Sequence, residues 1–410
     1  MLKRIPTKQV RLGMFIQALD GPWLSHPFWK TKFLLVEAAD LEALQRSQVA
    51  AVWIDDAKGL EVEDAPVGSP AQPAHAVQAV AEPAPAMAPS QMARPARVAA
   101  GAEIDRAAAL VNRSRQQVMN LFGEARLGKA VDAEQCLPLV EDVANSLARN
   151  PSALISLARL KTKDDYTYLH SVAVCALMVS LSRQLGLDEA QTREAGLAGL
   201  LHDVGKMMMP TEVLNKPGQL TDAEFAVMRS HPMRGYEALK EGSAVPEAAL
   251  EVCLHHHEKM DGSGYPHQQS GEQISLLSRM GAVCDVYDAI TSNRPYKSAW
   301  DAAGSLQRMA QWQGHFDPRI FQAFVKCVGI YPVGTLVKLH SGRLGVVVDQ
   351  HAANLVAPTV KVFFSTKSQM PIPVELLDLS SSNDRIVGRE VPADWGFKNL
   401  DEFWTQPDKR

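Results

Sequence analysis

The sequence predicts a mainly α-helical protein, with a helical domain preceded by a small α+β module and followed by a small β-rich appendage. Between 103 and 328, apolar residues recur three and four positions apart, which is the spacing of helices with one buried face. After 332 the apolar residues alternate, as in strands, and before 102 a long stretch rich in Ala and Pro interrupts the chain. We therefore predict four parts: a module at 1–61, a linker at 62–101, the helical domain at 102–331 and the appendage with its tail at 332–410.

The N-terminal module contains short extended runs, "MFIQAL", "FLLV" and "AAVWID", around one predicted helix, "DLEALQRSQ". The linker that follows it has few large apolar residues and no period that could bury a face, so we expect it to be flexible or partly extended.

The helical domain is predicted to hold roughly eight helices. The segments with helical spacing are 103–126, 165–186, 188–205, 221–239, 246–258, 274–292 and 302–313. In the appendage, "TLVKLHSGRLGVVVDQ" and "TVKVFFS" read as strands, and a hairpin turn is expected at Ser341 and Gly342.

The composition excludes some classes of function. The chain has 410 residues, 46% of them hydrophobic, and a net charge of −4, so no basic excess indicates binding to a nucleic acid polymer. Five cysteines are far apart and form no C-x-x-C, which favours reduced core thiols in a cytoplasmic protein. The start does not resemble a secretory signal, and the most apolar window, "SVAVCALMVSLS", is too short to span a membrane.

A pair of polar residues ends one of the most apolar predicted helices, in "LLHDVGK". His202 and Asp203 stand side by side, Gly205 lets the backbone turn, and Lys206 follows about one helical turn after His202. An imidazole and a carboxylate after an apolar run are costly to bury unless they pair with each other or with a cation. A divalent metal ion is a natural partner.

Further candidate ligands recur along the chain: His170, His231, His256, His257 and Asp285. Mixed His and Asp ligands suit iron, manganese, nickel, cobalt or zinc. Five His and two Asp exceed the needs of one ion, and two ions require a shared oxygen ligand, for which Asp203 is the candidate. The alternative is that these residues are helix caps and hydrogen-bonded core residues; it competes at each single position and is weak for all seven together.

Four motifs, "LLHDVGK", "HPMRGYEAL", "HHEKMDGSGYP" and "DVYDAITSNRPYK", stand in the order found in the HD-GYP subgroup of the HD superfamily of metal-dependent phosphohydrolases, which the chain resembles over about 150–330. Residues 1–60 resemble the uncharacterised module that precedes this domain in some members. The resemblance implies hydrolysis of cyclic di-GMP to linear pGpG, and on to GMP in some cases, by a metal-activated hydroxide at a two-metal site, with iron or manganese favoured.

The resemblance also implies roles for single residues. One ion would take His170, His202, Asp203 and Asp285, and the other Asp203, His231, His256 and His257. Asp203 and Lys206 would be catalytic, with Lys206 contacting a phosphate oxygen or helping to protonate the leaving group. Arg294 and Lys297 would clamp the second phosphate. Gly264, Tyr265 and Pro266 would form a lip near the site, as a structural element or a partner surface.

One position departs from the family pattern. Some relatives carry a Glu four residues before the first histidine, which allows a third metal, whereas this chain has Tyr166 there. We therefore predict two metal ions and leave open whether pGpG is cleaved further.

Two other functions stay open: hydrolysis of another cyclic dinucleotide such as cyclic GMP-AMP, and a weakly active sensor or interaction module that recruits diguanylate cyclase (GGDEF) proteins through the lip. The N-terminal module is a candidate for forming a homodimer or for regulating access to the site through the linker.

Overall fold

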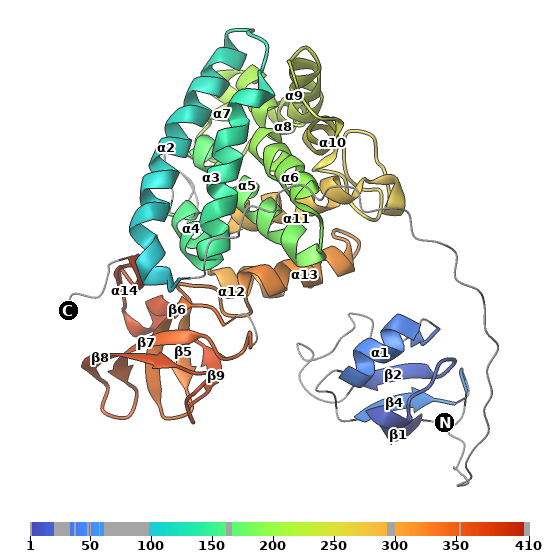
Figure 1. Cartoon of the computed structure of the whole chain (residues 1–410), viewed down its shortest axis with the longest axis vertical. Helices are drawn as coiled ribbons and strands as arrows, with labels where there is room; N and C mark the ends of the chain where they lie inside the picture. The colour runs from blue at the N-terminus through green and yellow to red at the C-terminus, as the bar shows by residue number, and fades with distance from the viewer. Residues whose placement is uncertain are drawn as a thin grey trace, which may run out of the picture. The chain divides into compact units, whose positions relative to one another are not determined.

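The computed structural model describes residues 2–19, 33–36, 38–46, 49, 51–56, 58–60, 98–160, 166–292, 300–351 and 354–405. The chain divides into two compact units, Met1–Met92 and Ala93–Arg410, and each is described by itself (Figure 1).

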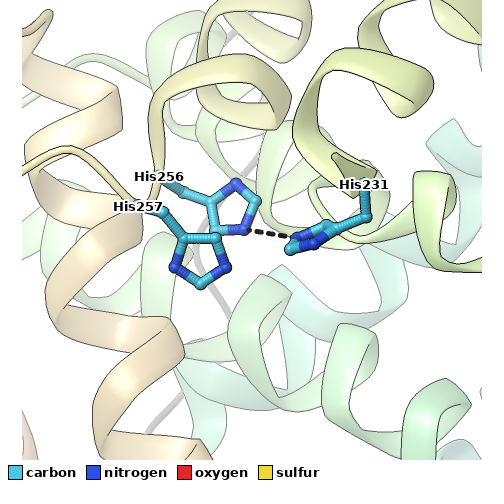
Figure 2. Close-up of side chains that lie close together, drawn as sticks. All are labelled: His231, His256 and His257. Carbon is cyan, nitrogen blue, oxygen red and sulfur yellow. Dashed lines mark hydrogen bonds between the residues drawn. The ribbon is translucent and has the colours of Figure 1, made fainter. Parts of the chain in front are cut away.

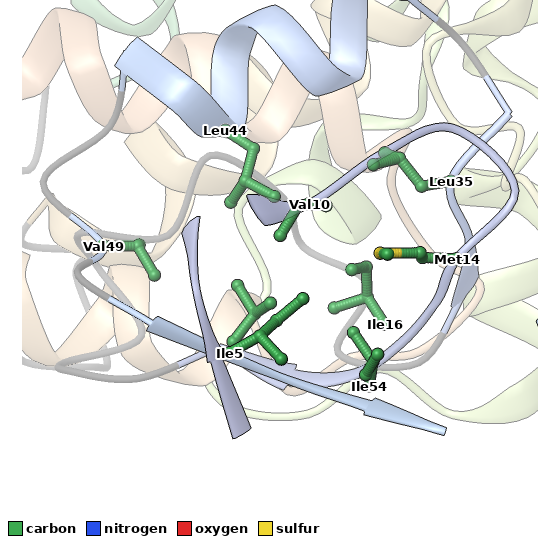
Figure 3. Close-up of a cluster of buried hydrophobic side chains, with 9 residues drawn as sticks. Ile5, Val10, Met14, Ile16, Leu35, Leu44, Val49 and Ile54 are labelled. Carbon is green, nitrogen blue, oxygen red and sulfur yellow. The ribbon is translucent and has the colours of Figure 1, made fainter. Parts of the chain in front are cut away.

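The first unit is a small α+β module, as predicted. Its sheet has the strand order β1-β4-β2-β3. The elements are β1 (Leu2–Pro6), β2 (Phe15–Leu19), β3 (Phe33–Leu34), α1 (Ala38–Arg46) and β4 (Ala51–Asp55). Ile5, Ile16, Ile54 and Leu44 bring the sheet and the helix together in one apolar core (Figure 3). Strand β1 was missed because "LKRIP" buries only Ile5 and so shows no alternation.

The second unit holds the helical domain. Its helices are α2 (Ala100–Arg126), α3 (Leu137–Arg149), α4 (Pro151–Ala158), α5 (Tyr166–Leu185), α6 (Glu189–Leu201), α7 (Thr211–Leu214), α8 (Asp222–Met228), α9 (His231–Lys240), α10 (Glu247–His255), α11 (Leu276–Thr291), α12 (Ala302–Met309) and α13 (Pro318–Val328). Each predicted helical segment contains a helix, but the prediction of roughly eight was too low. The segment 221–239 forms both α8 and α9, because Pro232 fits only the first turn of a helix.

Helix α5 is the centre of this unit. It is apolar on almost every side, and the run Val172–Val179 is buried throughout. Such a helix must be covered all round, and α5 packs against α2, α6, α11 and α13. A histidine on its first turns is therefore carried into the interior.

The C-terminal appendage is a five-stranded antiparallel sheet with the order β8-β7-β6-β5-β9. Its elements are β5 (Leu336–Leu339), β6 (Arg343–Asp349), β7 (Thr359–Ser365), β8 (Met370–Asp378), β9 (Ile386–Arg389) and the short helix α14 (Glu402–Thr405). The predicted hairpin joins β5 to β6, and Gly342 takes the positive φ of +83° that its turn needs. Strands β8 and β9 were not predicted.

None of the helices formed by the described residues is long and apolar enough to cross a bilayer. All five cysteines are free thiols, and four of them are buried. Burial raises the pKa of the Cys136 thiol to about 12, which fits the predicted core role.

Candidate metal centre

Six helical elements deliver the predicted ligands to one place. His170 lies on α5, and His202 ends α6 as its C-terminal cap. Asp203 is the N-terminal cap of the 3-10 helix η4 (Val204–Met208), which follows directly. The remaining candidates are His231 at the start of α9, His256 and His257 directly after α10, and Asp285 in the middle of α11. The structure thus brings all seven predicted residues together.

Gly205 allows η4 to approach α9 closely. A Cβ atom at this position would lie 1.9 Å from the carbonyl oxygen of His231 and 2.5 Å from the amide nitrogen of Gly235. Only a residue without a side chain fits such a contact. The close approach places His231 beside Asp203, two residues before this glycine.

One group of ligands gathers on one side of Asp203. Nε2 of His170 lies 3.3 Å from Oδ2 of Asp203 and 3.0 Å from Oδ1 of Asp285. Nε2 of His202 lies 3.3 Å from the same Asp203 oxygen and 3.9 Å from the same Asp285 oxygen. Candidate ligand atoms of His170, His202 and Asp285 all lie within 4.8 Å of one another.

A second group faces the other oxygen of Asp203. Oδ1 of Asp203 lies 3.2 Å from Nε2 of His231 and 3.8 Å from Nε2 of His256. The nitrogens of His231 and His256 are 3.4 Å apart, and the ring of His257 lies beside them (Figure 2). His257 also places Nδ1 3.9 Å from Oδ2 of Asp285. Each carboxylate oxygen of Asp203 therefore faces a different set of imidazoles.

Hydrogen bonds to the backbone orient three of these rings. Nδ1 of His202 lies 2.8 Å from the carbonyl oxygen of Gly199, and Nδ1 of His231 lies 2.8 Å from the carbonyl oxygen of Met228. Nδ1 of His256 lies 3.0 Å from the Val252 carbonyl oxygen. A carbonyl only accepts, so Nδ1 carries the proton, and the lone pair of Nε2 points into the centre.

The charges at the centre favour a bound cation. Burial lowers the pKa of His257 to about 3 and holds that of His256 well below its usual range, so both rings are neutral at pH 7. Burial alone would raise the pKa of Asp203, but Lys206, His202 and His170 hold it well below its ordinary value. Ionised carboxylates and neutral imidazoles are the protonation states that metal ligands require.

His170 differs from the other rings. Burial opposes its charged form, but hydrogen bonds with Asp203, Asp285 and Asp288 raise its pKa to about 10. Three carboxylates meet at this one imidazole, so the neighbourhood carries an excess of negative charge.

Two buried polar atoms test whether the residues fit a metal ion. Among the described residues, neither Nε2 of His202 nor Oδ1 of Asp203 has a hydrogen-bond partner. Buried lone pairs of this kind are costly unless a cation or donor meets them. With nitrogen and oxygen donors on both sides of Asp203, the residues fit divalent transition-metal ions.

The predicted lip packs directly against this centre. The ring of Tyr265 stacks on His257, with centroids 4.7 Å apart and planes inclined by 26°. The Tyr265-Pro266 peptide bond is cis. A Cβ atom at Gly264 would lie 2.5 Å from Cα of Glu258, so glycine is needed there.

Of the three basic residues predicted to contact the substrate, the structure describes Lys206. The ammonium group of Lys206 donates to Oδ2 of Asp203, and its side chain is 21% exposed. Arg294 and Lys297 lie outside the described residues. Tyr166 begins α5, and its side chain is also outside the description.

The third imidazole of the "HHH" run turns away from the centre. Nδ1 of His255 lies 3.1 Å from a Glu251 carboxylate oxygen, and Nε2 lies 2.9 Å from Nδ1 of His267.

Sequence reasoning missed Asp288. Its Oδ2 lies 2.6 Å from Nδ1 of His170, and its side chain is buried. An acid three residues after Asp285 in an apolar helix shares a face with it, and that spacing could have identified Asp288.

The fold and this centre define the class of protein. A model of the HD domain matches residues 141–320, and a model described as a domain of unknown function, DUF3391, matches residues 2–136. A cyclic di-GMP phosphodiesterase of Pseudomonas aeruginosa is 56% identical over 99% of this chain and 96% of its own length. The chain belongs to the HD-domain family of cyclic di-GMP phosphodiesterases, as the resemblance of its motifs predicted.

Other relatives match over shorter stretches. The cyclic di-GMP phosphodiesterase response regulator RpfG of Xanthomonas campestris is 44% identical over 36% of this chain and 39% of its own length. A 3′3′-cGAMP-specific phosphodiesterase of Vibrio cholerae is 36% identical over 39% of this chain and 31% of its own. Among solved structures, an HD-GYP-type protein of Bdellovibrio bacteriovorus is 14% identical with a TM-score of 0.46, covering 79% of this chain and 98% of that one.

Proposed function

We propose that this protein hydrolyses cyclic di-GMP to linear pGpG at a centre of two divalent metal ions. The proposal rests on one observation about Asp203: its two carboxylate oxygens face different sets of imidazoles. Among donor side chains of this centre, a carboxylate can bridge two ions and an imidazole cannot. The substrate is inferred from the relative that is 56% identical over nearly the full length.

In this proposal His170, His202 and Asp285 would hold one ion, His231, His256 and His257 would hold the other, and both ions would share Asp203. Iron and manganese are favoured, and nickel, cobalt and zinc suit the same donors. When bound, such ions lower the pKa of water and draw charge from phosphoryl oxygens.

The other residues act on the substrate around this centre. Lys206 reaches Asp203 from a partly exposed position, so its ammonium group can contact a phosphate oxygen or give a proton to the leaving 3′-oxygen. Tyr265 covers one face of His257 and limits the access of water there. Its pKa is raised by burial and by Asp285, so its hydroxyl group stays protonated and is no nucleophile. Arg294 and Lys297 remain the predicted clamp for the second phosphate.

The number of ions and the product are linked. With Tyr166 in place of an acid, we expect two ions per chain and pGpG as the main product. Metal titration of the purified protein checks the first expectation, and three bound ions per chain would contradict it. Chromatography of the reaction products over time checks the second.

The experiment that tests the function uses the full chain loaded with iron or manganese under reducing conditions. Wild-type protein should cut cyclic di-GMP, and Asp203→Asn should not, while Asp394→Asn on an exposed 3-10 helix should match wild type. Binding of cyclic di-GMP without turnover by the wild type would instead favour the sensor or interaction module. Faster turnover of 3′3′-cGAMP would favour the alternative substrate.

Three expectations from the sequence stay predictions: recruitment of diguanylate cyclases through the lip, formation of a homodimer and a cytoplasmic location.

A further inference from the structure

Tyr265 is covered on two sides. His257 stacks on its ring, and the guanidinium carbon of Arg229 lies 4.5 Å from the centroid of the same ring. Arg229 is the C-terminal cap of α8 and precedes His231 by two residues, so the start of α9 ties it to the metal centre. A cationic group is therefore held one aromatic ring away from a candidate metal ligand.

The side chain of Arg229 is exposed, and among the described residues it makes neither an ion pair nor a hydrogen bond. Neighbouring basic residues behave differently. Arg234 pairs with Glu237 at 3.6 Å, and Lys216 pairs with Glu224. Stacking on a ring restricts a guanidinium group but uses none of its five N–H donors. Arg229 is thus oriented by Tyr265 and keeps its donors available to an anion.

We infer that Arg229 is a substrate-binding residue that contacts the phosphate of the cyclic dinucleotide that is not at the metal ions. This inference rests on the proposed function and adds a contact to those predicted for Arg294 and Lys297. A cyclic dinucleotide carries two phosphates, and the one that is not cleaved needs a cationic partner beside the centre. The planar guanidinium group can give two parallel hydrogen bonds to one phosphate.

A comparison of two substrates distinguishes direct binding of the substrate by Arg229 from an indirect effect on the metal centre. Cyclic di-GMP has a second phosphate, whereas bis(p-nitrophenyl) phosphate has only the phosphate that is cleaved. For Arg229→Ala we expect kcat/KM for cyclic di-GMP to fall about 10- to 100-fold, mainly through KM, as for the loss of a hydrogen bond to a charged group. Turnover of bis(p-nitrophenyl) phosphate should stay unchanged.

Two further variants make the test specific. Arg229→Lys keeps the charge but loses the planar fork, so it should recover only part of the loss. Arg234→Ala removes an exposed arginine that pairs with a carboxylate, and both substrates should be cut as by wild type. Metal content and melting temperature are measured for each variant to confirm equal loading and folding.

Equal losses on both substrates, or a lower metal content of Arg229→Ala, would show that Arg229 acts through Tyr265 on the centre, and the inference would be wrong. An unchanged KM for cyclic di-GMP would also overturn it. If wild type cuts bis(p-nitrophenyl) phosphate but not cyclic di-GMP, the proposed function fails instead. Binding of cyclic di-GMP to the metal-free protein, compared between wild type and Arg229→Ala, then still decides the role of the arginine.

Discussion

Nδ1 of His170 on α5 lies 2.6 Å from Oδ2 of Asp288 on α11, and both side chains are buried. The other oxygen of Asp288 accepts a hydrogen bond from the hydroxyl group of Ser292, which fixes the carboxylate in turn. A carboxylate on Nδ1 keeps a proton there, so a bound metal ion would replace the proton on Nε2, the nitrogen that faces Asp203 and Asp285. Asp288 therefore orients a candidate ligand without being one.

We expect Asp288→Asn to weaken metal binding by about 10- to 100-fold, because an amide holds the imidazole less firmly and removes a negative charge. The affinity is measured by competition between the apo-protein and a coloured chelator. Asp142→Asn, on an exposed position of α3, serves as the control and should bind metal as wild type does. An unchanged affinity of Asp288→Asn would exclude this role.

Because the two oxygens of Asp203 face different groups of candidate ligands, substitutions in this centre should remove different numbers of metal ions. His202→Ala and His257→Ala each remove a donor from only one of the two groups, so each should retain about one ion per chain in place of two. Asp203→Asn removes the shared carboxylate and should lose both ions. Elemental analysis of the gel-filtered proteins gives the count, and His340→Ala, on the exposed end of the appendage hairpin, provides the reference. Equal losses in all three variants would contradict a bridging role for Asp203.

The candidate ligands could be identified from the sequence because each lies in a motif with a fixed order and a chemically costly composition. His202 and Asp203 after an apolar helix, or His256 and His257 before a glycine-rich turn, stand out without a structure. The contacts of Asp288 and Arg229 could not be predicted, since they depend on how α11 packs on α5 and how α8 meets the lip.

The strands of the N-terminal module and of the C-terminal appendage show the same limit of prediction from sequence. Alternation in β2 and β4 reflects one buried face, whereas β6 has a run of four buried residues, and all three strands were predicted. Strand β8 has two prolines, Pro371 and Pro373, and no buried side chain, so its pattern gives no signal. It forms because its backbone pairs with β7, which is a tertiary relationship.

Gly205 offers a test of the packing that places His231. Gly205→Ala should destabilise the protein by more than about 2 kcal/mol, because the added carbon collides with the backbone of His231 and Gly235, which cannot yield as a flexible side chain does. Metal affinity should fall with it. In the control, Gly123→Ala, the new carbon meets nothing within 4 Å inside helix α2, so stability should rise by about 0.5–1 kcal/mol. Urea unfolding measures both, and a neutral Gly205→Ala would refute the close contact.

Glu103 on α2 is a fully buried carboxylate far from the metal centre. It accepts hydrogen bonds from Nε and Nη2 of Arg149, at 2.8 and 2.6 Å, and from the hydroxyl group of Ser146, at 3.1 Å, so it joins α2 to α3. Burial raises the pKa of Glu103, but these partners outweigh burial, and the pKa lies below its ordinary value of 4.5. The ionised form is thus favoured in the folded state.

A lowered folded-state pKa means that the ion pair stabilises the protein fully above the unfolded-state value of about 4.5, and that this contribution is lost as the pH falls through the folded-state value. At pH 7, Glu103→Gln should cost about 2–3 kcal/mol, near the lower end for a broken buried pair because Arg149 stays 24% exposed and keeps some water. The difference between wild type and Glu103→Gln in urea unfolding should shrink as the pH is lowered from 6 toward 3. Glu134→Gln, on an exposed 3-10 helix, controls for the general effect of removing a charge. A difference that stays constant over this range would mean that the pKa of Glu103 is the same in the folded and the unfolded protein.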